Sequence, residues 1–182
     1  MADYTAIKYN VPFSKAGNLK LIKTLTSDGS DDDLSFVDGT SDVVLDSTYK
    51  EYLFIFNSIH PETDGATFTF QGNAAGGSGY NETITSTLFV AALSEEDSYE
   101  ALSYQTAQDQ AQGTGFQTLA NKVGNDNDQC CSGYLRLFNP SSTTFVKHFM
   151  GECNTYMTDT LQFTQVHHVA GYFNTTSAID EI

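Results

Sequence analysis

The segment Tyr49–Ile59 constrains the fold of this 182-residue chain more than any other. Phe54 and Phe56 fall on one face of an extended strand, and Leu53 and Ile55 fall on the other. Aromatic and aliphatic residues arranged in this way suit a pleated sheet. Because both faces are apolar in the middle of the segment, we predict a central strand that is buried between two layers.

Shorter segments of the same kind follow one another along the chain, and turn-forming clusters separate them. Alternating or apolar runs predict strands over residues 19–25, 34–37, 66–71, 80–91, 116–123, 131–138, 145–153, 161–169 and 170–173. The turn at Asn139-Pro140 predicts that the strands on either side of it form a hairpin. Together these signals predict an all-β protein, a mainly antiparallel β-sandwich of jelly-roll type.

Two segments differ from this pattern. Residues 1–18 include Pro12 and have no sustained period, so we expect an extended N-terminal arm ahead of one domain at residues 19–182. In residues 94–112, Ser94 precedes three acidic residues, as at the start of a helix. We expect a helix of at most about two turns there, followed by a polar loop.

The charge of the chain excludes some classes of partner. It has 23 acidic residues and 8 basic residues, which gives a net charge of −15. We therefore expect binding neither to nucleic acid nor to an anionic membrane, because phosphate binding needs clustered Lys and Arg. No apolar run is long enough to span a membrane, and the N-terminus lacks a signal-peptide pattern, so we expect synthesis in a cytoplasm.

The beginning of the chain is basic, unlike the remainder. Residues 1–23 contain four lysines and one aspartate. Two interpretations remain open: the arm docks on an acidic partner surface, or it is a solvated tail. In the docking interpretation, the candidate contact residues are Lys8, Tyr9, Pro12, Phe13 and Lys15.

The cysteines do not indicate a disulfide framework, because there are three of them and Cys130 is adjacent to Cys131. A disulfide from one of these two to Cys153 across a hairpin is the alternative to buried, reduced thiols, which we favour. For nucleophilic catalysis the nominal pair is Cys131 with His148, but nothing in the sequence orients it. No known catalytic or phosphate-binding motif is present, so we expect no enzyme and no cofactor.

Three further features have both a functional and a structural interpretation. The acidic run Asp28–Asp33 is a candidate calcium site or a solvated turn, and Asn125–Asp128 leaves the same choice. Tyr80, Tyr99 and Tyr104 are candidates for a ligand loop that stacks on sugar rings, or they pack in the core or an interface. We otherwise predict no metal site, since the adjacent His167 and His168 would point to opposite faces of a strand.

Five short motifs occur in order within residues 19–182. They are LIKT at 21–24, DSTYKEY at 46–52, IHPETDGA at 59–66, FNPSS at 138–142 and AGYFNTTSAI at 170–179. This series resembles a diffuse family of virion proteins of tailed bacteriophages, which is frequent among marine phages. Members of that family usually continue for one or two strands beyond the last motif, so the resemblance implies either a longer chain or an open sheet edge.

The resemblance implies a structural, non-enzymatic role on the exterior of a bacteriophage particle. The expected location is the virion, as a capsid decoration protein or as a tail or fibre subunit. The expected partners are other virion proteins and further copies of the chain, in a symmetric oligomer such as a trimer. The alternative function is a module of a tail fibre that binds a host receptor or a host glycan.

Overall fold

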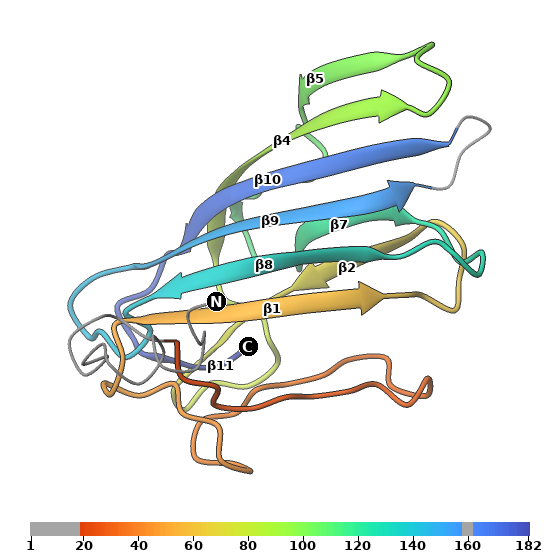
Figure 1. Cartoon of the computed structure of the whole chain (residues 1–182). Helices are drawn as coiled ribbons and strands as arrows, with labels where there is room; N and C mark the ends of the chain where they lie inside the picture. The colour runs from red at the N-terminus through yellow and green to blue at the C-terminus, as the bar shows by residue number, and fades with distance from the viewer. Residues whose placement is uncertain (1–18, 158–161) are drawn as a thin grey trace, which may run out of the picture.

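The computed structural model describes residues 19–157 and 162–182, and within these residues every regular element is a β-strand (Figure 1). The prediction of an all-β, antiparallel β-sandwich is therefore confirmed. The predicted arm at residues 1–18 lies outside the described residues. The described part of the chain contains no helix that could cross a membrane.

The eleven strands of the described residues range in length from two to eleven residues. They are β1 Glu51–Ile59, β2 Ala66–Phe70, β3 Asn73–Ala74, β4 Ile84–Ser94, β5 Glu100–Tyr104, β6 Ala111–Gly113, β7 Gln117–Val123, β8 Cys131–Phe138, β9 Lys147–Met157, β10 Phe163–Phe173 and β11 Ile179–Glu181.

Six strands form the main layer, in the order β1-β8-β9-β10-β4-β5, and all neighbouring pairs are antiparallel. The predicted hairpin around Asn139-Pro140 is confirmed, because β8 pairs with β9. Its register places Leu135 opposite Gly151 and Leu137 opposite Phe149. Alternate side chains of this layer therefore point to the same face on every strand.

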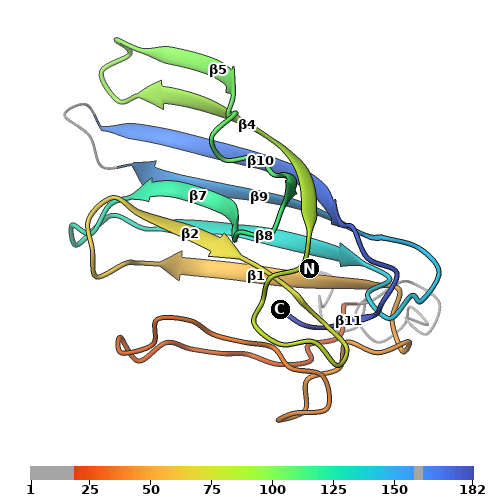
Figure 2. The same ribbon diagram turned by 180° about the vertical axis from the view of Figure 1, so that it is seen from behind.

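A smaller layer covers one face of the main sheet (Figure 2). It contains the antiparallel pair β2–β7, which joins the main sheet where Val123 pairs with Met157. Strands β3 and β11 form a separate two-stranded sheet, and β6 pairs with the start of β4. Residues 36–38 close this side, since the N–H of Phe36 donates to the carbonyl of Ile182 at 2.7 Å.

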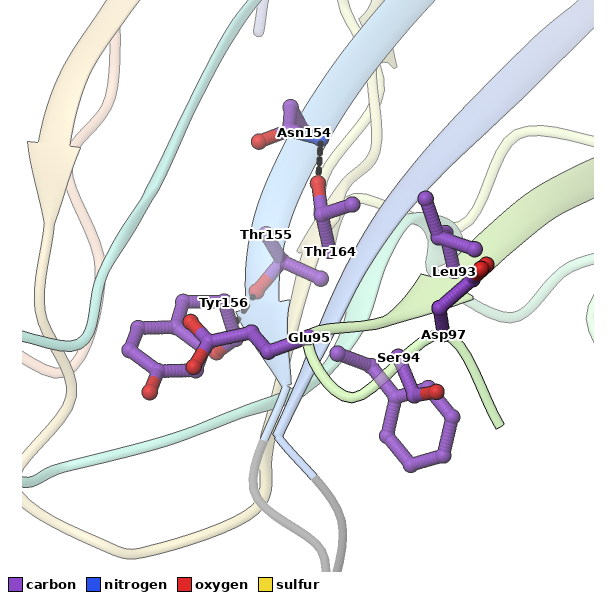
Figure 3. A pocket seen from close by; sticks show the side chains of 9 residues that line it. Leu93, Ser94, Glu95, Asp97, Asn154, Thr155, Tyr156 and Thr164 are labelled. Carbon is purple, nitrogen blue, oxygen red and sulfur yellow. Dashed lines mark hydrogen bonds between the residues drawn. The ribbon is translucent and has the colours of Figure 1, made fainter. Parts of the chain in front are cut away.

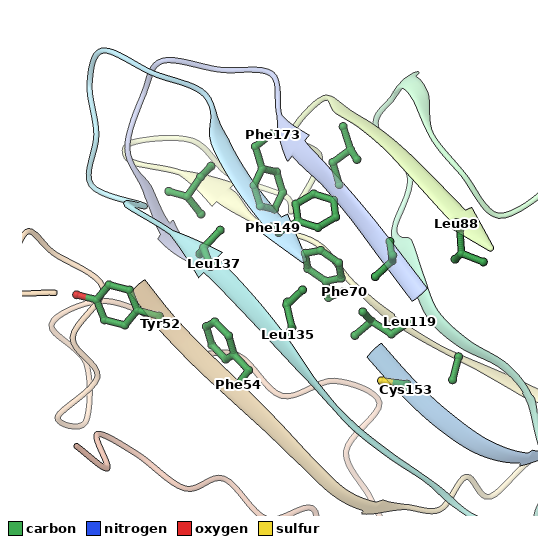
Figure 4. Packing of buried hydrophobic residues seen from close by; sticks show 14 of the residues in the cluster. Tyr52, Phe54, Phe70, Leu88, Leu119, Leu135, Leu137, Phe149, Cys153 and Phe173 are labelled. Carbon is green, nitrogen blue, oxygen red and sulfur yellow. The ribbon is translucent and has the colours of Figure 1, made fainter. Parts of the chain in front are cut away.

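The core lies between the two layers (Figure 4). Phe70 of β2 meets Phe149 of β9 edge to face, with ring centroids 5.0 Å apart. Leu135 and Leu137 of β8 and Phe173 of β10 are fully buried around this contact. The alternation in the sequence thus supplies the apolar row that each strand turns inward.

The predicted central position of Tyr49–Ile59 is wrong. β1 is an edge strand that pairs only with β8 among the described strands. Its inward residue Phe54 is buried, whereas Ile55 on the other face is 60% exposed. Both faces are apolar because one packs in the core and the other belongs to a sheet face that no described element covers.

The predicted strands near the beginning of the domain are also wrong. Residues 19–25 form no strand, although they are extended and Ile22 packs against the core. Over residues 34–37 the only pairing among described residues is an isolated bridge from Val37 to Glu181. Alternation favours an extended backbone, but a strand also needs a neighbour with unpaired hydrogen-bonding groups.

The predicted helix in residues 94–112 is wrong, and this segment contains β5 and β6 instead. Ser94 does accept hydrogen bonds at its Oγ, but from the N–H groups of Ser98 and Tyr99, both at 3.0 Å. These bonds close the turn between β4 and β5. The two strands predicted over 161–173 are a single strand, β10, because Val169 and Ala170 continue the same ladder to β9 and β4.

Candidate interaction surface

The main sheet has one face that packs in the core and one face that no described element covers (Figures 1 and 2). We call the second one the outer face. The strand registers place a continuous row of side chains along its middle, from one edge of the sheet to the other. This central row consists of Ile55, Tyr134, Glu152, His168, Phe89 and Tyr104.

Large apolar side chains are exposed over the whole outer face. The least exposed of them is Tyr134 at 36%, and the most exposed is Leu102 at 75%. Monomeric soluble proteins rarely leave a wide contiguous apolar patch in water. The exposed apolar members are Ile55, Phe89, Leu93, Leu102, Tyr104, Tyr134 and Met150.

Arg136 provides the positive charge at the centre of the outer face. Its guanidinium forms an ion pair with Glu51 and lies 5.7 Å from the ring centroid of Tyr134. Both charged side chains are nearly half exposed, so this pair contributes little to the stability of the fold. The guanidinium of Arg136 instead supplies a planar group with several hydrogen-bond donors beside the ring of Tyr134. Such a group is suited to contact with another molecule.

His168 lies in the same row between an acid and an aromatic ring. Its Nδ1 is 3.0 Å from Oε2 of Glu152, and its ring stacks on Phe89 with centroids 4.8 Å apart. A second imidazole on this face, His148, contacts the ring of Tyr172 at 5.8 Å. The outer face therefore contains aromatic, imidazole and paired charged groups in alternation.

A shallow hollow of about 360 Å³ lies at one end of the outer face, beside the β4–β5 turn (Figure 3). Leu93, Glu95, Tyr156 and Thr164 are among the residues that line it, and the Nδ2 of Asn154 donates to Thr164 Oγ1 at 2.8 Å across it. A second hollow of about 210 Å³ shares Leu93 with it. Both hollows are open to solvent.

The three candidate tyrosines do not come together. Tyr99, at the β4–β5 turn, packs edge to face on Phe163 at 5.4 Å. Tyr104, at the other end of β5, donates a hydrogen bond of 2.6 Å to Asp109. Tyr80 lies in the loop between β3 and β4, and β3 pairs with β11 rather than with β5. Only Tyr104 belongs to the outer face.

Tyr80 sits among acidic groups, and burial together with the charge of Glu181 raises its pKa. It forms a hydrogen bond to Ser35, which fixes the loop against the beginning of the domain. The candidate arm residues Lys8, Tyr9, Pro12, Phe13 and Lys15 lie outside the described residues, so their docking role stays a prediction.

The acidic turns are accounted for by hydrogen bonds within the chain. Asp28 accepts bonds from the N–H and the hydroxyl of Ser30, at 3.0 and 2.6 Å, and these bonds lower the pKa of Asp28. The side-chain amide of Asn125 donates to the carbonyl of Glu62 at 2.8 Å, which ties two loops together. In residues 19–157 and 162–182, no group of three or more His, Cys, Asp or Glu side chains is placed to hold a metal ion.

All three cysteines are free thiols, as predicted, but Cys130 is only partly buried. Cys131 and Cys153 are buried in the core, and burial raises the pKa of each thiol to about 12. The nominal pair of Cys131 and His148 is not assembled, because Cys131 points into the core whereas His148 lies on the outer face. A protonated, buried thiol is neither a nucleophile nor a metal ligand.

The outer face was not predicted from the sequence, although its residues follow from the alternation. A period of two divides each strand into two sets of side chains, but it does not reveal which set is covered. The buried polar residues were missed for the same reason. Lys147 is fully buried, and its ammonium donates to the carbonyls of Phe145 and Thr175, both at 3.1 Å.

No family model, no curated protein and no solved structure matches this chain. The class of this protein is therefore described from its fold and its outer face alone. It is an antiparallel β-sandwich domain of unequal layers, with one large apolar sheet face that no described element covers.

Proposed function

We propose that this chain is a structural, non-enzymatic subunit on the exterior of a tailed-bacteriophage particle, and that it acts through contacts between subunits. The observation that carries the proposal is the outer face, where seven large apolar side chains are exposed on one sheet. The five motifs that resemble phage virion proteins support the assignment to a particle.

The composition of the outer face is that of an interface centre. Aromatic residues, Met and Arg are enriched where proteins meet, and they contribute most of the binding energy. The face presents Tyr134, Phe89 and Met150, together with Arg136, which is the only arginine of the chain. A specific interface buries about 800 Å² on each partner, and a sheet of six strands is wide enough to supply it.

The charges of the outer face favour an apolar partner surface. Glu51 lies beside Arg136 and Glu152 lies beside His168, so these two acids have basic neighbours on the face. Most of the 23 acidic residues lie outside the strands, in loops. A neighbouring subunit with an apolar centre can therefore approach this face without meeting the field of the whole acidic body.

The buried thiols support a role without catalysis. Cys131 and Cys153 are enclosed in the core, and the nominal base His148 lies on the opposite side of the sheet. The imidazole of His167, which is buried, is hydrogen-bonded to Asn121 in the interior. Cys131, Cys153 and His167 therefore contribute to the packing of the interior.

The test is incorporation of the chain into particles. A tagged copy is supplied during infection as wild type, as Met150→Glu or as Leu34→Glu, and its copy number in purified particles is measured by quantitative mass spectrometry. Met150 is 53% exposed at the centre of the outer face, and Leu34 is 44% exposed away from it. A buried charge in an interface costs several kcal/mol, so we expect at least about tenfold less of Met150→Glu in particles, with Leu34→Glu unaffected.

Absence of the wild-type chain from purified particles would refute the assignment to the virion. Normal incorporation of Met150→Glu would refute the role of the outer face. If that variant is incorporated but has lost binding to host glycans on an array, the same face belongs to a glycan-binding module and the structural proposal fails.

A further inference from the structure

Residues 19–26, which we call the leading segment, form an extended stretch that pairs with no described strand. Among the residues that the structure describes, none forms a hydrogen bond with them. Ile22 turns inward and packs against the core. Leu19 and Leu21 turn away from it and are 80% and 79% exposed, more than any other large apolar side chain that is described.

This pattern is that of a strand whose ladder is incomplete. The backbone is extended, and the side chain of Ile22 is anchored in the domain. Leu19 and Leu21, which point to the opposite side, are apolar and exposed. Each leucine side chain that is moved from water into an apolar contact favours association by about tenfold or more. The leading segment therefore offers apolar side chains and backbone groups that form no hydrogen bond with a described residue.

The main sheet has a matching open edge at β5. This strand pairs only with β4, and nothing described lies on its other side. Edge strands are usually protected by Lys, Pro or a bulge. The sequence of β5, EALSY, has none of these protections, and its Leu102 is 75% exposed.

The other edge of the sheet is not equally open. Residues 19–45 of the same chain run along the free side of β1 in both views (Figures 1 and 2). Phe36 is fixed there by two hydrogen bonds with Ile182, and its ring packs on Phe54 with centroids 5.3 Å apart. The leading segment is thus held beside β1, while β5 lies across the whole width of the sheet, about 24 Å away for six strands.

The charges of the two elements are complementary. The leading segment contains Lys20 and Lys23 and no acid. The β4–β5 turn and the start of β5 contain Glu95, Glu96, Asp97 and Glu100, all exposed and none in an ion pair with a described residue. Lysines and acids placed in this way favour contact between one copy and the next, rather than between like surfaces.

We propose that the leading segment of one copy binds along the free edge of β5 in a second copy, as an added β-strand. Main-chain hydrogen bonds supply the ladder, and Leu19 and Leu21 pack beside Leu102. Because two different surfaces meet, the contact is heterologous. It closes into a ring of three or more copies or continues as a filament.

Of the apolar residues of the outer face, only Leu102 belongs to this contact, which does not depend on the proposed role in a virus particle. It predicts self-association of the purified full-length chain. The oligomeric state is measured by size-exclusion chromatography with light scattering and by sedimentation velocity over a range of concentrations. Urea unfolding of each variant checks that the domain still folds.

The first comparison is between Leu19→Ser/Leu21→Ser and the control Leu34→Ser, which removes an exposed leucine outside the leading segment. We expect the double variant to associate at least about a hundredfold more weakly than wild type, and the control to associate normally. A wild-type chain that stays monomeric, or a double variant that associates like wild type, would overturn the inference.

The second comparison exchanges the charges. Lys20→Glu/Lys23→Glu should dissociate the oligomer, and adding Glu95→Lys/Glu100→Lys to the same chain should restore it. Failure of this restoration contradicts a contact between the leading segment and β5. Association that is lost in Met150→Glu but kept in Leu19→Ser/Leu21→Ser places the contact on the outer face, which overturns this inference and leaves the proposed function standing.

Discussion

The buried imidazole of His167 should make the folded protein sensitive to acid. His167 is fully buried on β10, where its Nε2 lies 3.0 Å from Oδ1 of Asn121 on β7. Burial in the core disfavours the charged imidazolium and lowers the pKa of His167 from 6.5 to about 4. In the unfolded chain the ring is hydrated, and its pKa returns to its ordinary value.

The direction and size of the effect follow from this difference in pKa. Because the folded-state pKa is the lower one, the unfolded state binds the proton more tightly, and acid favours unfolding. The contribution of His167 to stability is complete above its unfolded pKa of 6.5 and is lost as the pH falls toward about 4. A gap of about 2.5 pKa units corresponds to about 3 kcal/mol.

The assay is urea unfolding monitored by far-UV circular dichroism, because the chain has no Trp whose fluorescence could report unfolding. Between about pH 7 and about pH 4.5 the free energy of unfolding of wild type should fall by about 2 kcal/mol more than that of His167→Gln. His168→Gln is the matched control, because it removes an imidazole from the next position of the same strand but from the outer face. Equal losses in wild type and His167→Gln would show that this imidazole does not couple folding to pH.

Two further predictions concern packing in the core. Gly171→Ala should destabilise the fold by about 1–3 kcal/mol in urea unfolding, because the added Cβ would lie 2.6 Å from the carbonyl oxygen of Thr85 on β4. Gly115→Ala is the control: its added Cβ would have no neighbour closer than 3.5 Å, and it should change stability by less than about 0.5 kcal/mol. In the folded protein, iodoacetamide should alkylate the half-exposed Cys130 and spare Cys131 and Cys153, whose pKa values are about 12, as peptide mass spectrometry will show. Alkylation of all three at equal rates would contradict the buried positions of the last two.

The strands that pair with a sequence neighbour were predictable from the chain. The hairpin β8–β9 is an example, because the turn at Asn139-Pro140 and the apolar row containing Leu135 and Leu137 specify both partners and the inward face. These signals are local: a period of two, a turn and β-favouring residues. Where all three occur together, the predicted and observed strands agree closely.

The errors in the fold arise where the outcome depends on distant parts of the chain. Residues 19–25 alternate as a strand would, but no described strand pairs with them. Ser94 and the acids after it match a helix start, but the free side of β4 accepts β5 as a neighbour, and Ser94 caps the turn. Neither the pairing partner of a strand nor the free side of another one is encoded locally.

The outer face shows the same limit for the candidate site. The apolar residues on both faces of Tyr49–Ile59 led to the prediction of a strand covered on two sides, and the apolar character itself was correct. What the sequence did not reveal is that Ile55 and its cross-strand neighbour Tyr134 face solvent in the described chain. Apolar alternation on both faces is thus compatible with burial in the domain or burial against a partner.

The net charge of −15 and the apolar outer face have opposite effects on association, and their different locations decide how copies can meet. The charge keeps copies apart at long range, but it is screened beyond about 10 Å at moderate salt. Two outer faces would bring two acidic bodies together across a wide area, so repulsion opposes that arrangement. A contact of Lys20 and Lys23 with the acidic β4–β5 turn instead neutralises charge where it forms. The physical arrangement therefore favours edge-to-edge growth between copies and leaves the outer face for a partner that is less acidic than the chain itself.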